Sequence, residues 1–67
     1  MADWERDPDG GYSAMVTPPS QRFARGVAVY PVAGRKWMAM TIEMSPTRSG
    51  PYKTLAKAKT EAVKLIR

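Results

Sequence analysis

The clearest hydrophobic pattern lies at the C-terminal end of the chain. Apolar residues recur there at the i, i+3, i+7, i+10 and i+11 spacing of one helix face: Leu55, Ala58, Ala62, Leu65 and Ile66. Basic residues, with one threonine among them, fall on another face: Lys53, Lys57, Thr60, Lys64 and Arg67. The spacing predicts an amphipathic helix from Thr54 to Arg67 that docks by its apolar side, with the Thr54 hydroxyl capping its first turn.

Residues 22–44 alternate between two sides with a period of two, which is typical of strands. The first strand, Arg22–Val32, has two alternating sets: Phe23, Val27 and Val29, and Ala24, Ala28 and Tyr30. The second strand, Lys36–Met44, also has two: Met38, Met40, Ile42 and Met44, and Trp37, Ala39, Thr41 and Glu43. The short turn Ala33–Arg35 separates them, so the pattern predicts an antiparallel hairpin.

A second hairpin is predicted nearer the N-terminus. The stretch Asp7–Gly11 contains Pro followed by Asp-Gly, which is typical of a tight turn. Trp4–Arg6 and Tyr12–Thr17 would be its two strands. Pro18–Ser20 then interrupts regular structure, and Ser45–Pro51 is predicted to be a loop that ends the sheet.

These elements predict one α+β domain, an antiparallel sheet of three to four strands packed against one C-terminal helix. Residues 12–67 would form the domain, and residues 1–11 an acidic segment and turn, or a disordered tail that moderates non-specific binding. We expect the helix to cover the face of Met38, Met40 and Ile42, because these side chains bury more apolar area than their neighbours on the other face. Trp37 would then lie on the open face.

Composition narrows the chemistry. The chain has 67 residues and neither cysteine nor histidine, which excludes disulfides, thiolate nucleophiles, imidazole bases and the usual zinc sites. Glu43 and Glu61 are isolated in sequence, so we expect no enzyme and no cofactor. No apolar run approaches the ~18 residues of a membrane span, and we expect a soluble, cytoplasmic protein. A domain this small is marginally stable, so a homodimer or a partner could complete it.

Charge is segregated along the chain. The formal net charge is +5, but residues 1–9 carry −3 and residues 10–67 carry +8. A strongly cationic body attracts polyanions, of which nucleic acid is the commonest inside cells, followed by acidic protein surfaces. Charge that serves only solubility is the other interpretation.

Basic and aromatic residues are interleaved in the predicted hairpin: Arg22, Phe23, Arg25, Tyr30, Arg35, Lys36 and Trp37. Guanidinium groups pair with phosphates and bases, and aromatic rings stack on bases, although these rings could equally fill the core. The helix lysines could follow phosphates, dock on an acidic protein or simply be solvated. The five methionines are an adaptable binding surface or core filler.

A series of landmarks runs across residues 25–66: Arg25-Gly26-Val27, Pro31, Gly34, Lys36-Trp37, Ala39, Gly50-Pro51-Tyr52-Lys53-Thr54, Ala58 and Ala62. Their order resembles that in the AP2 and phage-integrase N-terminal DNA-binding domains. The resemblance implies a three-stranded sheet backed by one helix, with Arg25, Arg35, Lys36 and Trp37 facing DNA. Small phage-encoded proteins share this layout, so a viral origin is a further expectation.

The sequence thus predicts a nucleic-acid-binding module, with DNA favoured over RNA. The expected contact residues are Arg22, Arg25, Arg35, Lys36, Trp37, Arg48, Lys53, Lys57 and Lys64. The alternative is an inhibitor or adaptor, for example phage-encoded, that docks on an acidic surface of a larger host protein. The methionines and Trp37 would then be its interface anchors.

Overall fold

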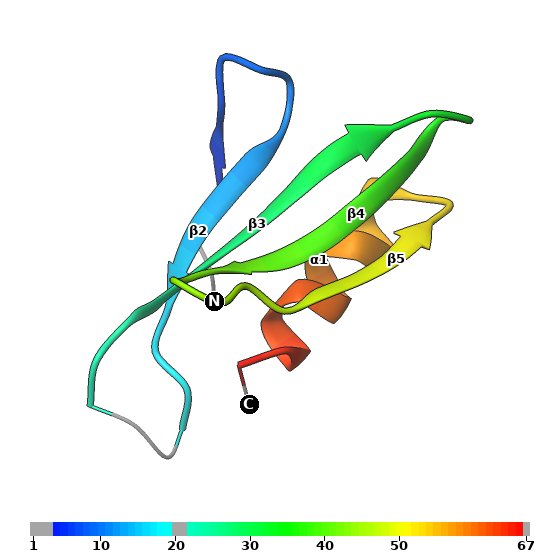
Figure 1. Cartoon of the computed structure of the whole chain (residues 1–67). Coiled ribbons are helices and arrows are strands. Elements are labelled where there is room, and N and C mark those ends of the chain that lie inside the picture. The colour runs from blue at the N-terminus through cyan, green and yellow to red at the C-terminus, as the bar shows by residue number, and fades with distance from the viewer. Residues whose placement is uncertain (1–3, 20–21, 67) are drawn as a thin grey trace.

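The sheet of this protein is antiparallel and its strands lie side by side in chain order (Figure 1). A computed structural model describes residues 4–19 and 22–66, and within them it has five strands and one helix. The elements are β1 (Glu5–Arg6), β2 (Tyr12–Val16), β3 (Arg25–Val32), β4 (Lys36–Ile42), β5 (Arg48–Tyr52) and α1 (Leu55–Lys64). The predicted α+β class with a C-terminal helix is confirmed, but the predicted three to four strands were too few.

The predicted hairpin is present as β3 and β4, and β3 is the central strand of the sheet. Its register pairs Val29 with Ala39, and both strands alternate between the two faces. Gly34 and Arg35 have φ of 82° and 58° in the connecting turn. Left-handed backbone costs glycine little, whereas at Arg35 it is a strained conformation for a long side chain.

The predicted N-terminal hairpin is also present. Glu5 pairs with Ser13 and Arg6 pairs with Tyr12. The turn is closed by the Asp7 amide, which donates to the Gly11 carbonyl at 2.8 Å, and by the Gly11 amide, which donates to a carboxylate oxygen of Asp9 at 3.0 Å. The described part of the acidic segment is therefore a strand and a turn of the sheet, and the expectation of a disordered tail is wrong for it.

Strand β5 occupies residues that were predicted to be a loop. Ala39 pairs with Ser49, and Trp37 pairs with Tyr52 after a register shift that accommodates one extra residue on β5. Gly50 supplies the φ of 117° at this shift. Proline is tolerated here because β5 is an edge strand, whose outer amides need no partner. The hydroxyls of Ser49 and Tyr52 are hydrogen-bonded to each other.

Helix α1 begins as predicted, because the Thr54 hydroxyl accepts a hydrogen bond of 3.1 Å from the Lys57 amide. Ala58 and Ala62 are buried, as is Ile66 just beyond the helix, and Leu55 and Leu65 are half-buried. The predicted apolar stripe is thus confirmed. Arg67 lies outside the described residues.

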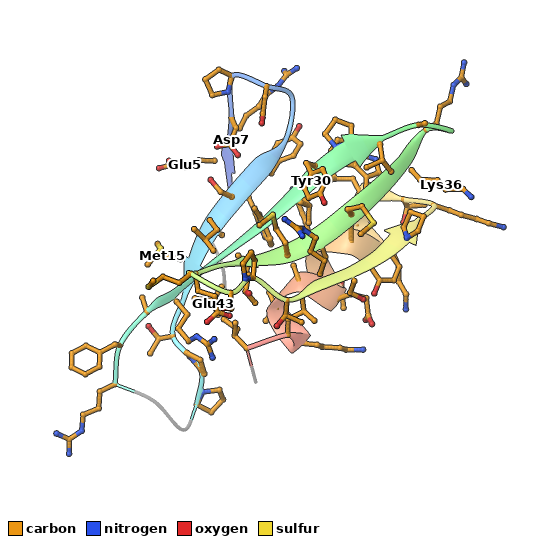
Figure 2. All side chains as sticks on the ribbon, viewed as in Figure 1. Glu5, Asp7, Met15, Tyr30, Lys36 and Glu43 are labelled. Carbon is orange, nitrogen blue, oxygen red and sulfur yellow. The ribbon has the colours of Figure 1, made fainter. Side chains whose placement is uncertain are left out.

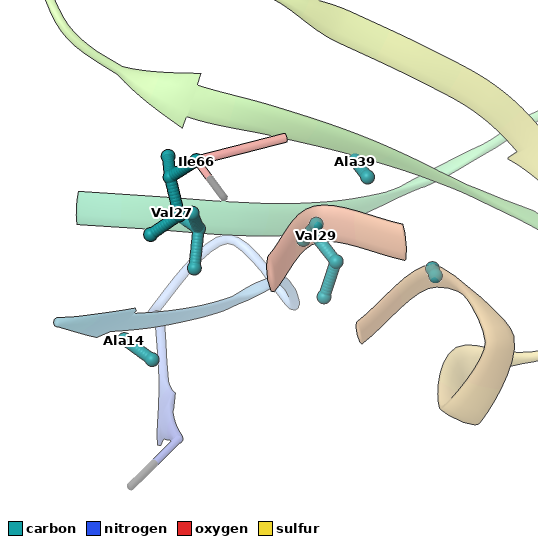
Figure 3. Packing of buried hydrophobic residues seen from close by; sticks show 7 residues of the cluster. Ala14, Val27, Val29, Ala39 and Ile66 are labelled. Carbon is teal, nitrogen blue, oxygen red and sulfur yellow. The ribbon is translucent and has the colours of Figure 1, made fainter. Parts of the chain in front are cut away.

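The face that the helix covers is the opposite of the one predicted. Figure 3 shows the core around Val27, Val29 and Ala39, which the helix contacts through its alanines. Four alanines are among the core residues: Ala14, Ala39, Ala58 and Ala62. Small side chains on both sides let the backbones of helix and sheet approach closely, and this outweighs the larger area of the methionines. The β-branched pair on β3 supplies the bulk.

One polar side chain is buried in this core and is fully bonded. Thr41 is 1% exposed. Its hydroxyl donates to Glu43 at 2.7 Å and accepts from the Thr47 amide at 2.9 Å. The β4–β5 loop is therefore tied to the core, and the third position of the Trp37, Ala39, Thr41 set is buried despite being polar.

Across residues 4–19 and 22–66, none of the helical structure has the length and apolarity that a membrane crossing requires.

Candidate functional site

Four predicted contact residues gather along β4, β5 and the turn before β4. Because Trp37 pairs with Tyr52, Lys36 and Lys53 occupy neighbouring positions at the end of these two strands. Arg35, in the turn, directly precedes Lys36. Arg48 pairs with Met40 farther along the same strands. We call these four residues the cationic edge: Arg35, Lys36, Arg48 and Lys53. All four are exposed, and the described part of the chain gives none of them an ion-pair partner.

Three other predicted contact residues are engaged by carboxylates. Arg25 lies 3.2 Å from Glu43 and donates to both of its oxygens. On the helix, Lys64 lies 3.0 Å and Lys57 3.9 Å from the same oxygen of Glu61. Their charge is therefore partly neutralised within the fold, and they attract a polyanion less than the cationic edge does.

Glu61 is stabilised in its ionised form by these lysines. The hydrogen bond from Lys64, followed by the attraction of Lys64 and Lys57, lowers the pKa of Glu61, and partial burial opposes the shift. The predicted basic face of the helix thus has a carboxylate, Glu61, between Lys57 and Lys64. This face therefore attracts a polyanion less strongly than its number of lysines indicates.

Trp37 lies on the helix-covered side, where its ring centroid is 6.1 Å from that of Tyr12. It packs against the core and is half-buried, so the expectation that it lies on the open face is wrong. Arg22 is exposed in the loop before β3, at the opposite end of that strand from Arg35. Eight residues of strand separate the two ends by about 26 Å, so Arg22 does not belong to the cationic edge.

The sheet face that the helix leaves uncovered is mostly apolar. Figure 2 views the molecule from this side, with Met15, Tyr30 and Lys36 labelled. We call it the open face, and define it by six residues on alternate positions of β2, β3 and β4: Met15, Ala28, Tyr30, Met38, Met40 and Ile42. Met15 is 64% and Ile42 54% exposed. Met15, Met38 and Met40 lie on this face and outside the buried core. The interpretation of the methionines as core filler is therefore wrong for these three.

Sequence reasoning missed one lysine with a structural role. The Lys59 ammonium lies 4.5 Å from the centroid of the Tyr12 ring and 5.4 Å from that of Trp4. The Lys59 side chain is half-buried, and it reaches from α1 toward β2 and the segment before β1. Its position four residues after Leu55 and three before Ala62 places it at the margin of the apolar stripe, and that spacing was the available signal.

Charge changes sign across the sheet. The β1 strand and its turn carry Glu5, Asp7 and Asp9 against Arg6, whereas the cationic edge lies on the other side. The described structure therefore has an acidic side and a basic side rather than a uniform coat.

Comparisons of the chain with protein-family models, with curated proteins and with solved structures gave no match.

Proposed function

We propose that this protein is a nucleic-acid-binding module that contacts phosphates through the cationic edge. The observation that carries the proposal is the clustering of four exposed cations without carboxylate partners in the described structure. Phosphate contacts by such groups release counterions and supply most of the affinity of non-specific binding. The acidic β1 side would be held away from the polyanion.

The dimensions of the edge suit this role. Lys36 and Met40, the partner of Arg48, are four positions apart on β4, which corresponds to about 13 Å of strand. Phosphates of one DNA strand recur about every 3.4 Å along the helix axis, so the edge spans about four of them. Tyr30, on the open face beside Met38, is the aromatic side chain placed to stack on an unpaired base.

DNA is the proposed partner because of the resemblance of residues 25–66 to sheet-based DNA-binding domains. The contribution of the predicted residues is unequal in this proposal. Arg35, Lys36, Arg48 and Lys53 bind phosphate, while Arg25, Lys57 and Lys64 contribute less because Glu43 and Glu61 hold them. Trp37 stabilises the fold instead of stacking on bases.

A second candidate function is the protein-binding inhibitor or adaptor, and the open face favours it. An apolar centre with a polar rim is typical of protein interfaces, and methionine adapts to varied partners. Under this alternative the apolar contacts, rather than the cations, hold the partner. Binding would then weaken little with salt.

The test compares two double variants that each remove two lysines. Lys36→Gln with Lys53→Gln alters the cationic edge, and Lys57→Gln with Lys64→Gln alters the helix. Affinity for a labelled DNA duplex of mixed sequence is measured at several salt concentrations. We expect the edge variant to lose affinity and to lower the slope of log affinity against log salt by about 1.8, since each phosphate contact contributes about 0.9. The helix variant should change the slope by less than half of that.

Two results would count against nucleic-acid binding. One is wild-type affinity for duplex DNA, single-stranded DNA and RNA that is undetectable even at low salt. The other is equal loss in both double variants, because net charge alone would then explain binding.

A further inference from the structure

The open face has a lateral pattern that is complementary to itself. Strand pairing aligns one residue from each strand in a single row across the sheet: Glu5, Ser13, Ala28, Met40 and Arg48. This row has a carboxylate at one edge, a guanidinium at the other, and its smallest side chain at the centre. The neighbouring row runs Met15, Gly26 and Ile42, with the glycine again on the central strand.

We infer that the open face binds a second copy of this chain, face to face, about a two-fold axis that is parallel to the strands and passes over β3. Such a rotation exchanges β1 with β5 and β2 with β4, and it keeps every residue in its own row. Glu5 of each copy then faces Arg48 of the other. Isologous contacts of this kind bury the same patch on both subunits.

The apolar residues match in the same arrangement. Met15 of one copy faces Ile42 of the other, and these are two of the exposed large apolar side chains, at 64% and 54%. Gly26, Ala28 and Tyr30 lie near the axis. The two small residues allow the sheets to approach there, and the Tyr30 rings of the two copies would face each other. Packed sheets lie about 10 Å apart with strands aligned within about 30°, so side chains from both faces interdigitate.

Neither of the charged residues that would pair across the interface is engaged within the described chain. Glu5 and Arg48 are exposed, and neither takes part in an ion pair there. Ser13, which lies between Glu5 and Ala28 in the row, already donates to Asp7 at 3.0 Å, so its hydroxyl proton has a partner when covered. Dimerisation therefore leaves no charge of this row buried alone.

The size of the face predicts a weak dimer. The five strands have two, five, eight, seven and five residues. At about 3.3 Å per residue and about 4.8 Å between strands, the sheet covers on the order of 430 Å² in projection. Standard interfaces bury about 800 Å² of accessible surface per partner. We therefore expect association in the micromolar range, visible as a concentration-dependent mass.

The dimer does not depend on the proposed function, and it is compatible with it. The axis keeps the strand direction, so both β3–β4 turns point to the same end of the dimer. Two sets of Arg35, Lys36 and Lys53 would lie there, one on each side. Arg48 of the cationic edge and Tyr30, the proposed stacking residue, both lie on the open face and would be shared between the two surfaces.

Sedimentation equilibrium of nuclease-treated protein tests the dimer through charge reversal. Glu5→Arg places two cations opposite each other, and Arg48→Glu places two carboxylates opposite each other. The dimer dissociation constant of each variant alone should therefore rise by about tenfold or more. An equimolar mixture of the two should recover wild-type association as a heterodimer. The double variant, which exchanges the charges and keeps the net charge, should also recover it.

A second variant probes the apolar contact. Met15→Lys changes an exposed side chain, so the fold should be retained, and circular dichroism confirms this; the variant should be monomeric. A wild type that stays monomeric at all concentrations would overturn the dimer, and so would a mixture that fails to recover association. DNA binding by Lys36 and Lys53 is measured separately, so either proposal can fail alone.

Discussion

At the scale of single residues, the availability of each cation for a ligand depends on the carboxylates and aromatic rings near it. Within residues 4–19 and 22–66, lysine is exposed and without an ion pair at Lys36, paired with Glu61 at Lys64, and held against aromatic rings at Lys59. Spacing on a helix places lysines on one face, but Glu61 lies between Lys57 and Lys64 on that face. The cations of the sheet edge are therefore the stronger candidates for ligand binding.

The ionisation of Glu61 gives a pH-dependent stability. Its pKa is lowered below the ordinary value of 4.5, chiefly by the Lys64 hydrogen bond, so the folded state binds its proton less readily than the unfolded chain. The resulting stabilisation is present above that value and is lost as the pH falls through the lowered pKa. Glu61→Gln should thus be less stable than wild type at neutral pH and equal to it in strong acid.

Urea unfolding of wild type and Glu61→Gln at both pH values measures this effect. Glu43→Gln, compared at the same two pH values, is the control that shows how the free energy of unfolding changes when a different carboxylate is removed. A difference between wild type and Glu61→Gln that is unchanged by acid would contradict the assignment.

At the scale of elements, the helix and the N-terminal hairpin are joined through Lys59. Its ammonium lies within 6 Å of two ring centroids, at 4.5 Å from Tyr12 and 5.4 Å from Trp4. Both rings also pack against the buried core. The contact therefore secures the edge of the sheet that carries the acidic side.

Lys59→Met keeps most of the side-chain stem and removes the charge. We expect it to lower the free energy of unfolding by about 1 kcal/mol, because cation–π contacts contribute about 0.5–2 kcal/mol depending on exposure. Lys57→Met removes the same charge from an exposed position and should change stability by less than about 0.5 kcal/mol. Equal stability of the two variants in chemical denaturation would show that the ring contacts contribute nothing.

The elements also show what the sequence can and cannot predict. Period-two alternation predicted the β3–β4 hairpin, the turn residues Asp7–Gly11 predicted the N-terminal hairpin, and the Thr54 cap and apolar stripe predicted the helix. These signals are all local. Strand β5 was missed since Pro51 and Gly50 are read as a loop unless the strand is known to be an edge. The helix-covered face was mispredicted because β4 was judged alone, whereas Val27 and Val29 on the paired strand decide which face is buried.

At the scale of the whole molecule, the fold separates three surfaces. The helix covers one face of the sheet (Figure 1) and leaves the open face with its methionines uncovered. Acidic residues lie at the β1 edge and basic residues at the β5 edge. This separation could not be predicted from the sequence, because β5 brings Arg48 and Lys53 beside β4 only through a pairing that sequence signals argued against. The proposed function and the proposed dimer both follow from it.

The most direct test of the cationic edge is a titration of DNA into the ¹⁵N-labelled protein, followed by amide chemical shifts. We predict that the largest changes fall on Arg35, Lys36, Arg48 and Lys53 and that α1 beyond its first turn changes little. Changes confined to the helix residues Lys57–Lys64, or no changes at low salt, would contradict the account.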